Sequence, residues 1–430
     1  DLVKECKNEE SRGASPSSDV HIKAAIGEEE ILGDIEEKTT NHKEKVIERF
    51  FHHNKLRYGI VEKSYEQLID LSERVQRNHN IREKLSVSFV EEKLFAWVKS
   101  RFLDSGFKTT FVQYLSTEAE NVVQPLTVFV PLANIVVQTP FSFCGVIVRT
   151  ITKAMVNQLF EQMAAPKTEE EKQAHAEYVE RFRSDYQGYG AVVVDLPCEP
   201  KFAQEVALEK ASRVCDLLGI YFGYVFIPDI KCPVQIKGME GLKTSTTISF
   251  TEGRLITISK QVMGPASMQT IGINNDKLVQ MKKGGLDVVS QLENKKEKNE
   301  FEICVLNMAY LYAKAAFTPE PMEKLVYILS ALESTLLKNS NEPIQQNLAE
   351  RMAIVASSEL PKRKEIIRNV KFVYGLRSRY LHHGQSSTEL SRLSAFLLDV
   401  WLFYLRLLSS LGQYSSKEAF LDAIDDKKLA

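Results

Sequence analysis

The chain has 430 residues, of which 44% are hydrophobic and 26% are charged, and its formal net charge at pH 7 is −2. This length and apolar content suffice for two or three domains that each bury a core, and they exclude a wholly disordered chain. A net charge this small excludes general basicity as a source of nucleic-acid binding, so a polyanion site would need a local cluster of basic residues.

The six cysteines are scattered and form no C-x-x-C pair. Because no apolar signal sequence precedes the first polar stretch, this pattern favours neither a zinc framework nor secretion, and we expect the chain in the cytoplasm. The one long uncharged run, residues 125–148, contains three prolines that would interrupt a membrane-spanning helix. We therefore expect buried strands in that run, no membrane contact, and no metal ion or other cofactor.

The first hundred residues divide into a polar part and a helical part. Residues 1–42 are rich in Glu, Lys, Ser and Gly and are predicted to form a flexible tail. From residue 45 to residue 102 the apolar residues recur at helical spacing, as in Val46, Ile47, Phe50 and Phe51, which predicts two or three helices. The pair His52-His53 lacks Cys, Asp or Glu at ligand spacing, so we interpret it as an ordinary helix surface.

Strand and helix patterns alternate in the next section. Short β-branched runs bounded by Pro, Gly and Asn predict strands at residues 126–130, 135–137, 146–148 and 191–194. Helical patterns cover residues 151–163, 169–186 and 201–221, and residues 246–259 resemble a hairpin that turns at Glu252-Gly253. Residues 43–290 are therefore predicted to form a mixed α/β domain with a sensing or regulatory role.

A charged segment at residues 282–300, which contains Gly284-Gly285, marks the strongest change of composition and predicts a domain boundary. Beyond it every segment has a helical period, at residues 301–317, 321–337, 343–357, 362–383 and 387–411. Five antiparallel helices with short loops predict an all-α bundle over residues 300–415. The predicted fold class is thus α+β.

The helix predicted at residues 362–383 concentrates positive charge. It has a single acid, Glu365, and seven basic residues: Lys362, Arg363, Lys364, Arg368, Lys371, Arg377 and Arg379. Such a cluster attracts polyanions and releases counterions when phosphates bind. From the charges alone, a solvated helix face is the commoner explanation. The hypothesis of function makes Lys364, Arg368, Lys371 and Arg379 contacts to RNA.

His382 and His383 lie in the last turn of this helix, directly before Gly384. The helix macrodipole favours the protonated imidazole there, whereas the nearby arginines oppose it, so the imidazole pKa is expected to stay close to neutrality. A group of this pKa can move the proton of an RNA 2'-hydroxyl, and arginine can stabilise the phosphorane oxyanion. Arg377 and His382 lie about 140° apart on an ideal helix. One helix end also presents few groups for the two proton transfers of the reaction. A second copy facing the first would complete the site, so we expect a homodimer.

Residues 300–412 resemble the ApeA-like branch of the HEPN superfamily. The resemblance rests on Ala331-Leu-Glu333, Leu348-Ala-Glu-Arg351 and Tyr374-Gly-Leu-Arg377-Ser378, followed by His382-His383-Gly384. The signature of this superfamily is R-x(4-6)-H, which here matches Arg377 with either His382 or His383. Members with this motif are typically metal-independent endoribonucleases that dimerise and act in bacterial toxin or anti-phage defence systems.

The resemblance implies a role for each matching residue. Arg377, His382 and His383 would be catalytic, and Glu333, Tyr374 and Ser378 would support them. Many nucleolytic members carry a larger polar residue in place of Ser378. A helix-surface ion pair explains Glu333 and Arg351 equally well.

Two other interpretations stay open. The bundle would be a non-catalytic HEPN module that binds RNA or a protein partner, with histidines that only cap a helix. Alternatively, the α/β domain would be the enzyme and the bundle would only dimerise it. The glycine pairs lack the frame of a phosphate-binding loop, so no nucleotide site is predicted from motifs. A phage component or another ligand is expected as a trigger at the N-terminal domain.

Overall fold

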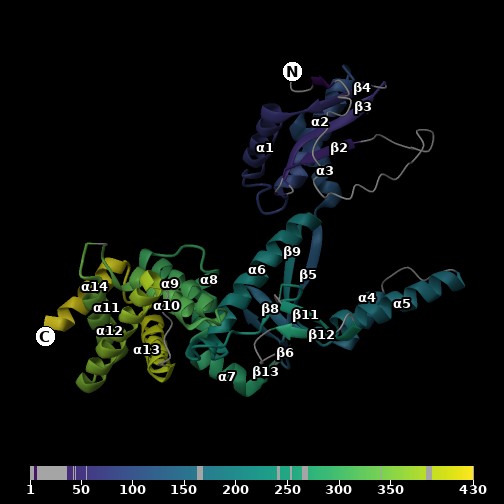
Figure 1. The fold of residues 1–430 in the computed structure, drawn as a ribbon. Helices are drawn as coiled ribbons and strands as arrows, with labels where there is room; N and C mark the ends of the chain where they lie inside the picture. Colours follow the sequence, from purple (N-terminus) through teal and green to yellow (C-terminus); the bar gives the residue numbers. More distant parts are fainter. Residues whose placement is uncertain are drawn as a thin grey trace. The chain divides into compact units, whose positions relative to one another are not determined.

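The computed structural model of the chain describes residues 4–6, 36–41, 43, 45–54, 56–161, 168–239, 243–251, 254–263, 270–339, 341–383 and 390–429. These residues form an α+β structure, as predicted (Figure 1). They group into two compact units, one of Asp1–Leu126 with Leu196–Glu205 and one of Thr127–Asp195 with Val206–Ala430. The boundary expected at residues 282–300 lies inside the second unit.

The first unit contains a four-stranded antiparallel sheet. Its order is β1 (Lys4–Cys6), β4 (Leu56–Ile60), β3 (Val46–His53) and β2 (Glu36–Thr40). The structure differs here from the expected tail at residues 1–42, since two pieces of that segment are strands. Both pieces form backbone hydrogen bonds with a neighbouring strand. Such pairing does not require apolar side chains, so a polar sequence can form a strand. Apart from Asn41, the remainder of the expected tail lies outside the described residues.

Residues 46–53 form a strand, and the helix predicted there is wrong. The spacing of the apolar residues fits a helix, but Asn54 adopts a positive φ of 51° and the chain turns back into β4. Adjacent side chains on a strand point to opposite faces, and both Phe50 and Phe51 are buried. Phe50 is covered by the guanidinium of Arg57, 3.5 Å from its ring centroid. Because both faces of this strand are buried, its sequence does not alternate between apolar and polar residues, and this alternation is the pattern that would have indicated a strand.

Three helices accompany this sheet: α1 (Glu62–Gln76), α2 (Val87–Leu103) and α3 (Phe111–Val122). α1 and α2 bury their apolar residues against Phe51 and Ile60, in a core completed by Tyr65, Leu68, Leu94 and Phe95. Ser86 caps the start of α2, and its hydroxyl accepts a hydrogen bond from the backbone N–H of Phe89. The expectation of helices after residue 60 is confirmed.

The second unit contains a five-stranded sheet in the order β10 (Gln235–Ile236), β5 (Gln124–Ala133), β9 (Gly190–Cys198), β8 (Val146–Thr150) and β7 (Phe141–Phe143). A separate parallel pair joins β6 (Ile135–Val137) to β13 (Ile271–Ile273). The four predicted strands are confirmed as β5, β6, β8 and β9. Residues 190–194 of β9 are all buried, which accounts for their continuous apolar run.

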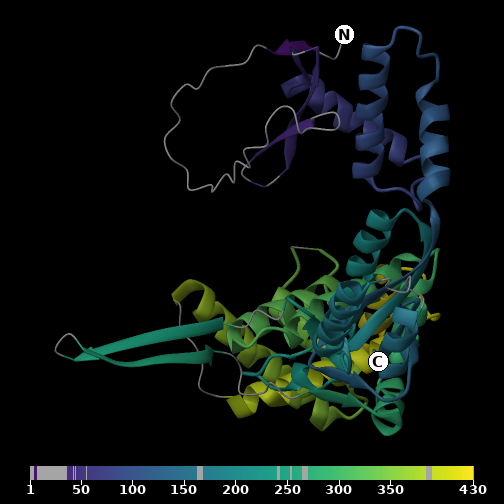
Figure 2. The same cartoon turned by 90° about the vertical axis from the view of Figure 1, so that its right-hand side faces the viewer.

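Helices α4 (Lys153–Glu161), α5 (Glu169–Tyr186) and α6 (Pro200–Tyr221) also form where predicted. α5 begins with a capping box in which Thr168 and Glu171 bond each other's backbone N–H groups. The predicted hairpin is confirmed as β11 (Lys243–Thr251) and β12 (Arg254–Met263), which pair only with each other in the described sheets (Figure 2). Its expected turn, Glu252-Gly253, lies outside the described residues.

The expected connector at residues 282–300 is largely helical. α7 (Asn275–Lys283) runs into it, and α8 (Leu286–Asn294) buries Leu286, Val289 and Leu292. Gly285 separates the two helices with a φ of +93°, and a Cβ at this position would lie 2.5 Å from Leu408 Cδ1. The glycine pair therefore permits a tight, packed turn between helices and does not form a loose linker.

The C-terminal segment is all helical, as expected, and it includes one helix that was not predicted. Its elements are α9 (Glu300–Ala316), α10 (Pro321–Leu336), α11 (Ile344–Ala356), α12 (Leu360–His383), α13 (Leu390–Ser409) and the additional α14 (Lys417–Leu429). Many apolar side chains of α13, among them Phe396, Phe403 and Tyr404, are buried. No helix in the described part of the chain is long and apolar enough to cross a membrane.

A buried lysine ties the short helix η2 (Tyr224–Phe226) and the loop after it to α10. Lys324 is 1% exposed, and its ammonium donates to the carbonyls of Tyr224, Ile227 and Ile230 at 2.9, 2.6 and 3.0 Å. Burial lowers the pKa of Lys324 to about 8, so the ammonium form predominates at pH 7. All three of its N–H donors are matched by acceptors.

Candidate functional site

The helix α12 has one buried face and one exposed, basic face. Ile366, Val370, Val373 and Leu376 are buried against the neighbouring helices. The basic face of α12, as we call it, consists of the exposed residues Lys364, Arg368, Lys371, Arg379 and His382. At 100° per residue these five positions lie within an arc of about 80°. All four predicted RNA contacts thus share one side of the helix with one of the two candidate histidines.

Within the described residues, the ion pairs of α12 involve Lys362 and Arg377, and none involves the lysines and arginines of this face. Lys371 acts on an acid of the neighbouring helix α11. Although burial acts to raise it, the pKa of Glu350 is lowered by Lys428 and, more weakly, by Lys371. Among the described residues no salt bridge therefore cancels the charges of Lys364, Arg368, Lys371 and Arg379, and these charges are available to an anionic ligand.

Arg377 lies on another side of α12, in a cluster with two residues predicted to support it. Its Nη1 is 2.6 Å from Oε1 of Glu333 on α10, and the hydroxyl of Tyr374 donates to the same oxygen at 2.5 Å. Burial, followed by this hydrogen bond to a carboxylate, holds the pKa of Tyr374 well above its usual range. The phenol therefore stays protonated and acts as a donor.

The guanidinium of Arg377 is only partly used by this cluster. The side chains of Arg377 and Glu333 are 23% and 24% exposed. Among the described residues Nη1 is the only nitrogen of Arg377 that forms a hydrogen bond, and Nε is buried without a partner. A buried donor without an acceptor costs free energy, so the interactions that hold Arg377 in place must outweigh the cost of its buried Nε.

The structure brings together some of the predicted site residues and separates others. Arg377, Tyr374 and Glu333 form one cluster, whereas His382 is exposed on the basic face, about 140° away around α12. Ser378 is exposed. His383 is the last residue of α12, but its side chain and Gly384 lie outside the described residues.

Sequence reasoning missed a buried acid that fixes the start of α12. Asp399 on α13 is fully buried and accepts a hydrogen bond from Asn369 at 2.9 Å. Its other oxygen lies 2.8 Å from Nζ of Lys362. Lys362, one of the seven basic residues of the predicted stripe, is therefore a structural partner. The available signal was a lone acid in the otherwise apolar run of residues 395–405.

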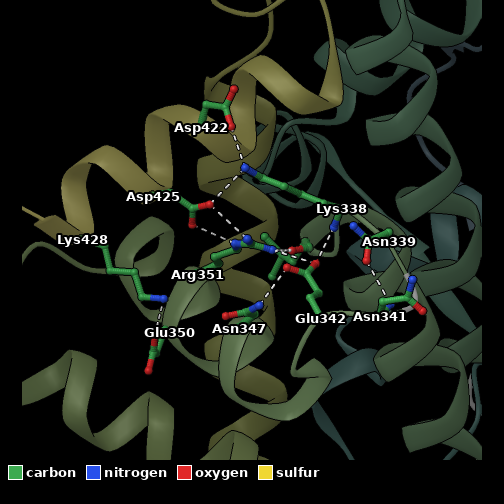
Figure 3. A network of polar contacts seen from close by, with 11 residues as sticks. Lys338, Asn339, Asn341, Glu342, Asn347, Glu350, Arg351, Asp422, Asp425 and Lys428 are labelled. Carbon is green, nitrogen blue, oxygen red and sulfur yellow. Dashed lines mark hydrogen bonds and ion pairs between the residues drawn. The ribbon is translucent and has the colours of Figure 1, made fainter.

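Arg351, quoted in the family resemblance, belongs to a separate network (Figure 3). It is 3% exposed, bonds both carboxylate oxygens of Asp425 on α14 at 3.0 Å, and reaches Glu342 at 3.0 Å and the carbonyl of Leu336 at 2.7 Å. Lys338 also contacts Asp425, at 3.3 Å. This network joins α11 to α14, so the ion-pair interpretation of Arg351 fits the structure.

The described residues contain no group of three or more His, Cys, Asp or Glu side chains placed to hold a metal ion. Chemically, the arrangement on α12 offers cations for phosphates, one exposed imidazole for proton transfer and one partly buried guanidinium. Comparison with family models, with curated proteins and with solved structures finds no match to this chain.

Proposed function

We propose that this chain is a metal-independent endoribonuclease of the HEPN type, that residues 300–415 are its HEPN bundle, and that it acts in a toxin or anti-phage defence role. The observation that carries the proposal is the basic face of α12, which ends at His382, five residues beyond Arg377. The remainder of the chain would control the nuclease in response to a phage component or another ligand.

The proposed reaction uses the RNA itself as the source of the nucleophile. His382 or His383 removes the proton of a 2'-hydroxyl, the hydroxyl oxygen attacks the adjacent phosphorus, and a second proton carrier protonates the leaving 5'-oxygen. Arg377 stabilises the charge on the phosphorane oxygens. The products are a 2',3'-cyclic phosphate and a free 5'-hydroxyl.

The placement of Arg377 favours a site built from two copies. In one chain the arginine and His382 lie on different sides of α12, so a single helix does not present both to one phosphate. A second copy facing the first would supply the missing group and the second proton carrier. Glu333 and Tyr374 would then hold Arg377 in place, in the role of positioning residues.

One observation favours the alternative of a non-catalytic module that binds RNA or a protein partner. Arg377 already has a carboxylate partner in Glu333 at 2.6 Å, as an arginine with a structural role would. In that case the basic face still binds phosphates, but no bond is cleaved.

Cleavage of labelled RNA in EDTA separates the two functions. We expect the unmodified protein to produce cyclic-phosphate ends, and Arg377→Ala and the double variant His382→Ala/His383→Ala to lower the rate at least about 100-fold. The matched controls, Arg74→Ala and His79→Ala, change exposed residues of the first unit and should cleave normally. RNA binding without cleavage by the unmodified protein would contradict the ribonuclease and favour the module.

A further inference from the structure

A cleft of about 450 Å³ lies between α5 and the strand β5 in the second unit, far along the chain from α12. Its walls include four aromatic side chains and two charged ones, namely Phe129, Tyr178, Phe182, Tyr186, Arg181 and Asp185. This volume falls within the range of pockets that hold small organic ligands, as does a lining that is mostly aromatic with few polar groups. The proposed nuclease chemistry uses none of these residues.

Three of the aromatic residues follow one another along the same side of α5. Tyr178, Phe182 and Tyr186 are spaced four residues apart, and the rings of Phe182 and Tyr186 lie 4.8 Å apart. Packing against α4 explains part of this cluster, since the ring of Phe160 is 5.3 Å from Phe182. The ring of Tyr178 also lies 5.8 Å from that of Phe160, but Tyr178 is 55% exposed, so this contact leaves much of its side chain open. Aromatic faces open to a cleft are stacking platforms for planar ligands.

The two charged residues of the cleft do not pair with each other. Arg181 and Asp185 are four residues apart on α5, a spacing at which opposite charges usually interact. Within the described residues neither side chain forms a hydrogen bond or ion pair; Asp185 is contacted only at its backbone carbonyl, by Lys237. A carboxylate acceptor and a guanidinium donor are therefore both available to a ligand.

A second cation lies at the Tyr186 end of the cleft. Nζ of Lys237 is 4.7 Å from the ring centroid of Tyr186 and 4.5 Å from that of Tyr189. Aromatic faces, one carboxylate and one cation therefore line the cleft, and a second cation lies beside it at Tyr186. An aromatic base linked to a phosphate has the complementary set of groups.

We propose that this cleft binds a guanine nucleotide. The base stacks on the aromatic side chains of α5, and the carboxylate of Asp185 accepts hydrogen bonds from the N1–H and N2–H groups of guanine. Adenine offers a carboxylate a single exocyclic amino group, so the acid favours guanine. Arg181 and Lys237 supply the positive charge for the phosphate. This inference is independent of the proposed ribonuclease.

Calorimetric titration of the full chain with GMP, AMP and the trinucleotide UGU tests the site. We expect GMP to bind at least about tenfold more tightly than AMP, which corresponds to one additional good hydrogen bond to a charged group. Asp185→Asn should remove this preference, and Tyr178→Ala should weaken both nucleotides about tenfold, since stacking does not distinguish bases. Glu170→Gln, an exposed acid on the same helix, is the charge-matched control and should bind like the unmodified protein.

The two sources of guanine give different results in the same titration. Tighter binding of GMP than of UGU indicates a free nucleotide as the ligand, and the reverse indicates guanine within RNA. The proposal is overturned if GMP does not bind at millimolar concentration, if GMP and AMP bind equally, or if Asp185→Asn keeps the preference. Unfolding midpoints of each variant show that the fold is retained. Since no cleavage is measured, these outcomes leave the ribonuclease proposal untouched.

Discussion

Two arginines in the C-terminal helices are bonded in contrasting ways. Arg351 is almost fully buried and has two carboxylates and one carbonyl as acceptors. Arg377 has one carboxylate oxygen as its acceptor, which it shares with Tyr374, and a buried Nε without a partner. Arg351 thus meets its hydrogen-bonding capacity inside the fold, as a structural residue does. Within the described part of the chain Arg377 keeps donors that its cluster does not use, which suits a residue that receives a further anionic ligand.

The network around Arg351 predicts a pH dependence of stability. The hydrogen bond from Arg351 is the main reason why the pKa of Asp425 lies below its ordinary value of 3.8. Burial acts in the opposite direction and raises this pKa. A depressed folded-state pKa contributes stability that is present above 3.8 and is lost as the pH falls through the folded value. We expect Asp425→Asn to lower the free energy of unfolding by about 1–3 kcal/mol at pH 7 and by less at pH 3.

Urea titrations at both pH values measure this difference. Asp426→Asn is the matched control, because the neighbouring acid is exposed, and it should change stability little at either pH. An equal loss for Asp425→Asn at pH 3 and pH 7 would show that its charge does not contribute.

Elements were predictable where the local pattern and the tertiary environment agree. α5 forms over the predicted residues because a capping box and a helical period coincide. β3 was mistaken for a helix because both of its faces are buried, and α8 for a linker because its charged flanks conceal three buried apolar residues. Local sequence does not reveal which surface will be covered, so these errors arise from packing.

The ammonium of Lys324 holds α10 to η2 and the loop after it, so we expect its removal to cause a large loss of stability. Lys324→Met keeps the length and apolar stem of the side chain but leaves the carbonyls of Tyr224, Ile227 and Ile230 without their donor. Buried acceptors without donors are costly, so we expect the free energy of unfolding to fall by at least about 3 kcal/mol. Urea titration measures this change in the free energy of unfolding.

Lys283→Met on α7 is the control, because Lys283 is exposed. A loss for Lys324→Met as small as in that control would contradict the role of Lys324 in holding the loop.

At the scale of the whole molecule, the candidate site was only partly predictable. Helical spacing alone puts Lys364, Arg368 and Lys371 on one side of a helix, and in the structure all three are exposed on α12. The partner of Arg377 is Glu333, 44 residues earlier, and only the packing of α10 against α12 brings the two together. The cleft at α5 depends likewise on a strand that is distant in sequence. Contacts of this kind have no local signature.

The salt dependence of RNA binding tests whether RNA binds at the basic face of α12. With a net charge of −2, the protein has no general excess of cations, so most counterion release should come from this face. For single-stranded RNA each neutralised phosphate contributes about −0.7 to the slope of log K against log salt concentration. The triple variant Lys364→Gln/Arg368→Gln/Lys371→Gln should therefore make the slope shallower by about 2 units. The charge-matched triple variant Lys277→Gln/Lys282→Gln/Lys283→Gln on α7 should leave it unchanged, and equal slopes for the two triple variants would place the RNA on another surface.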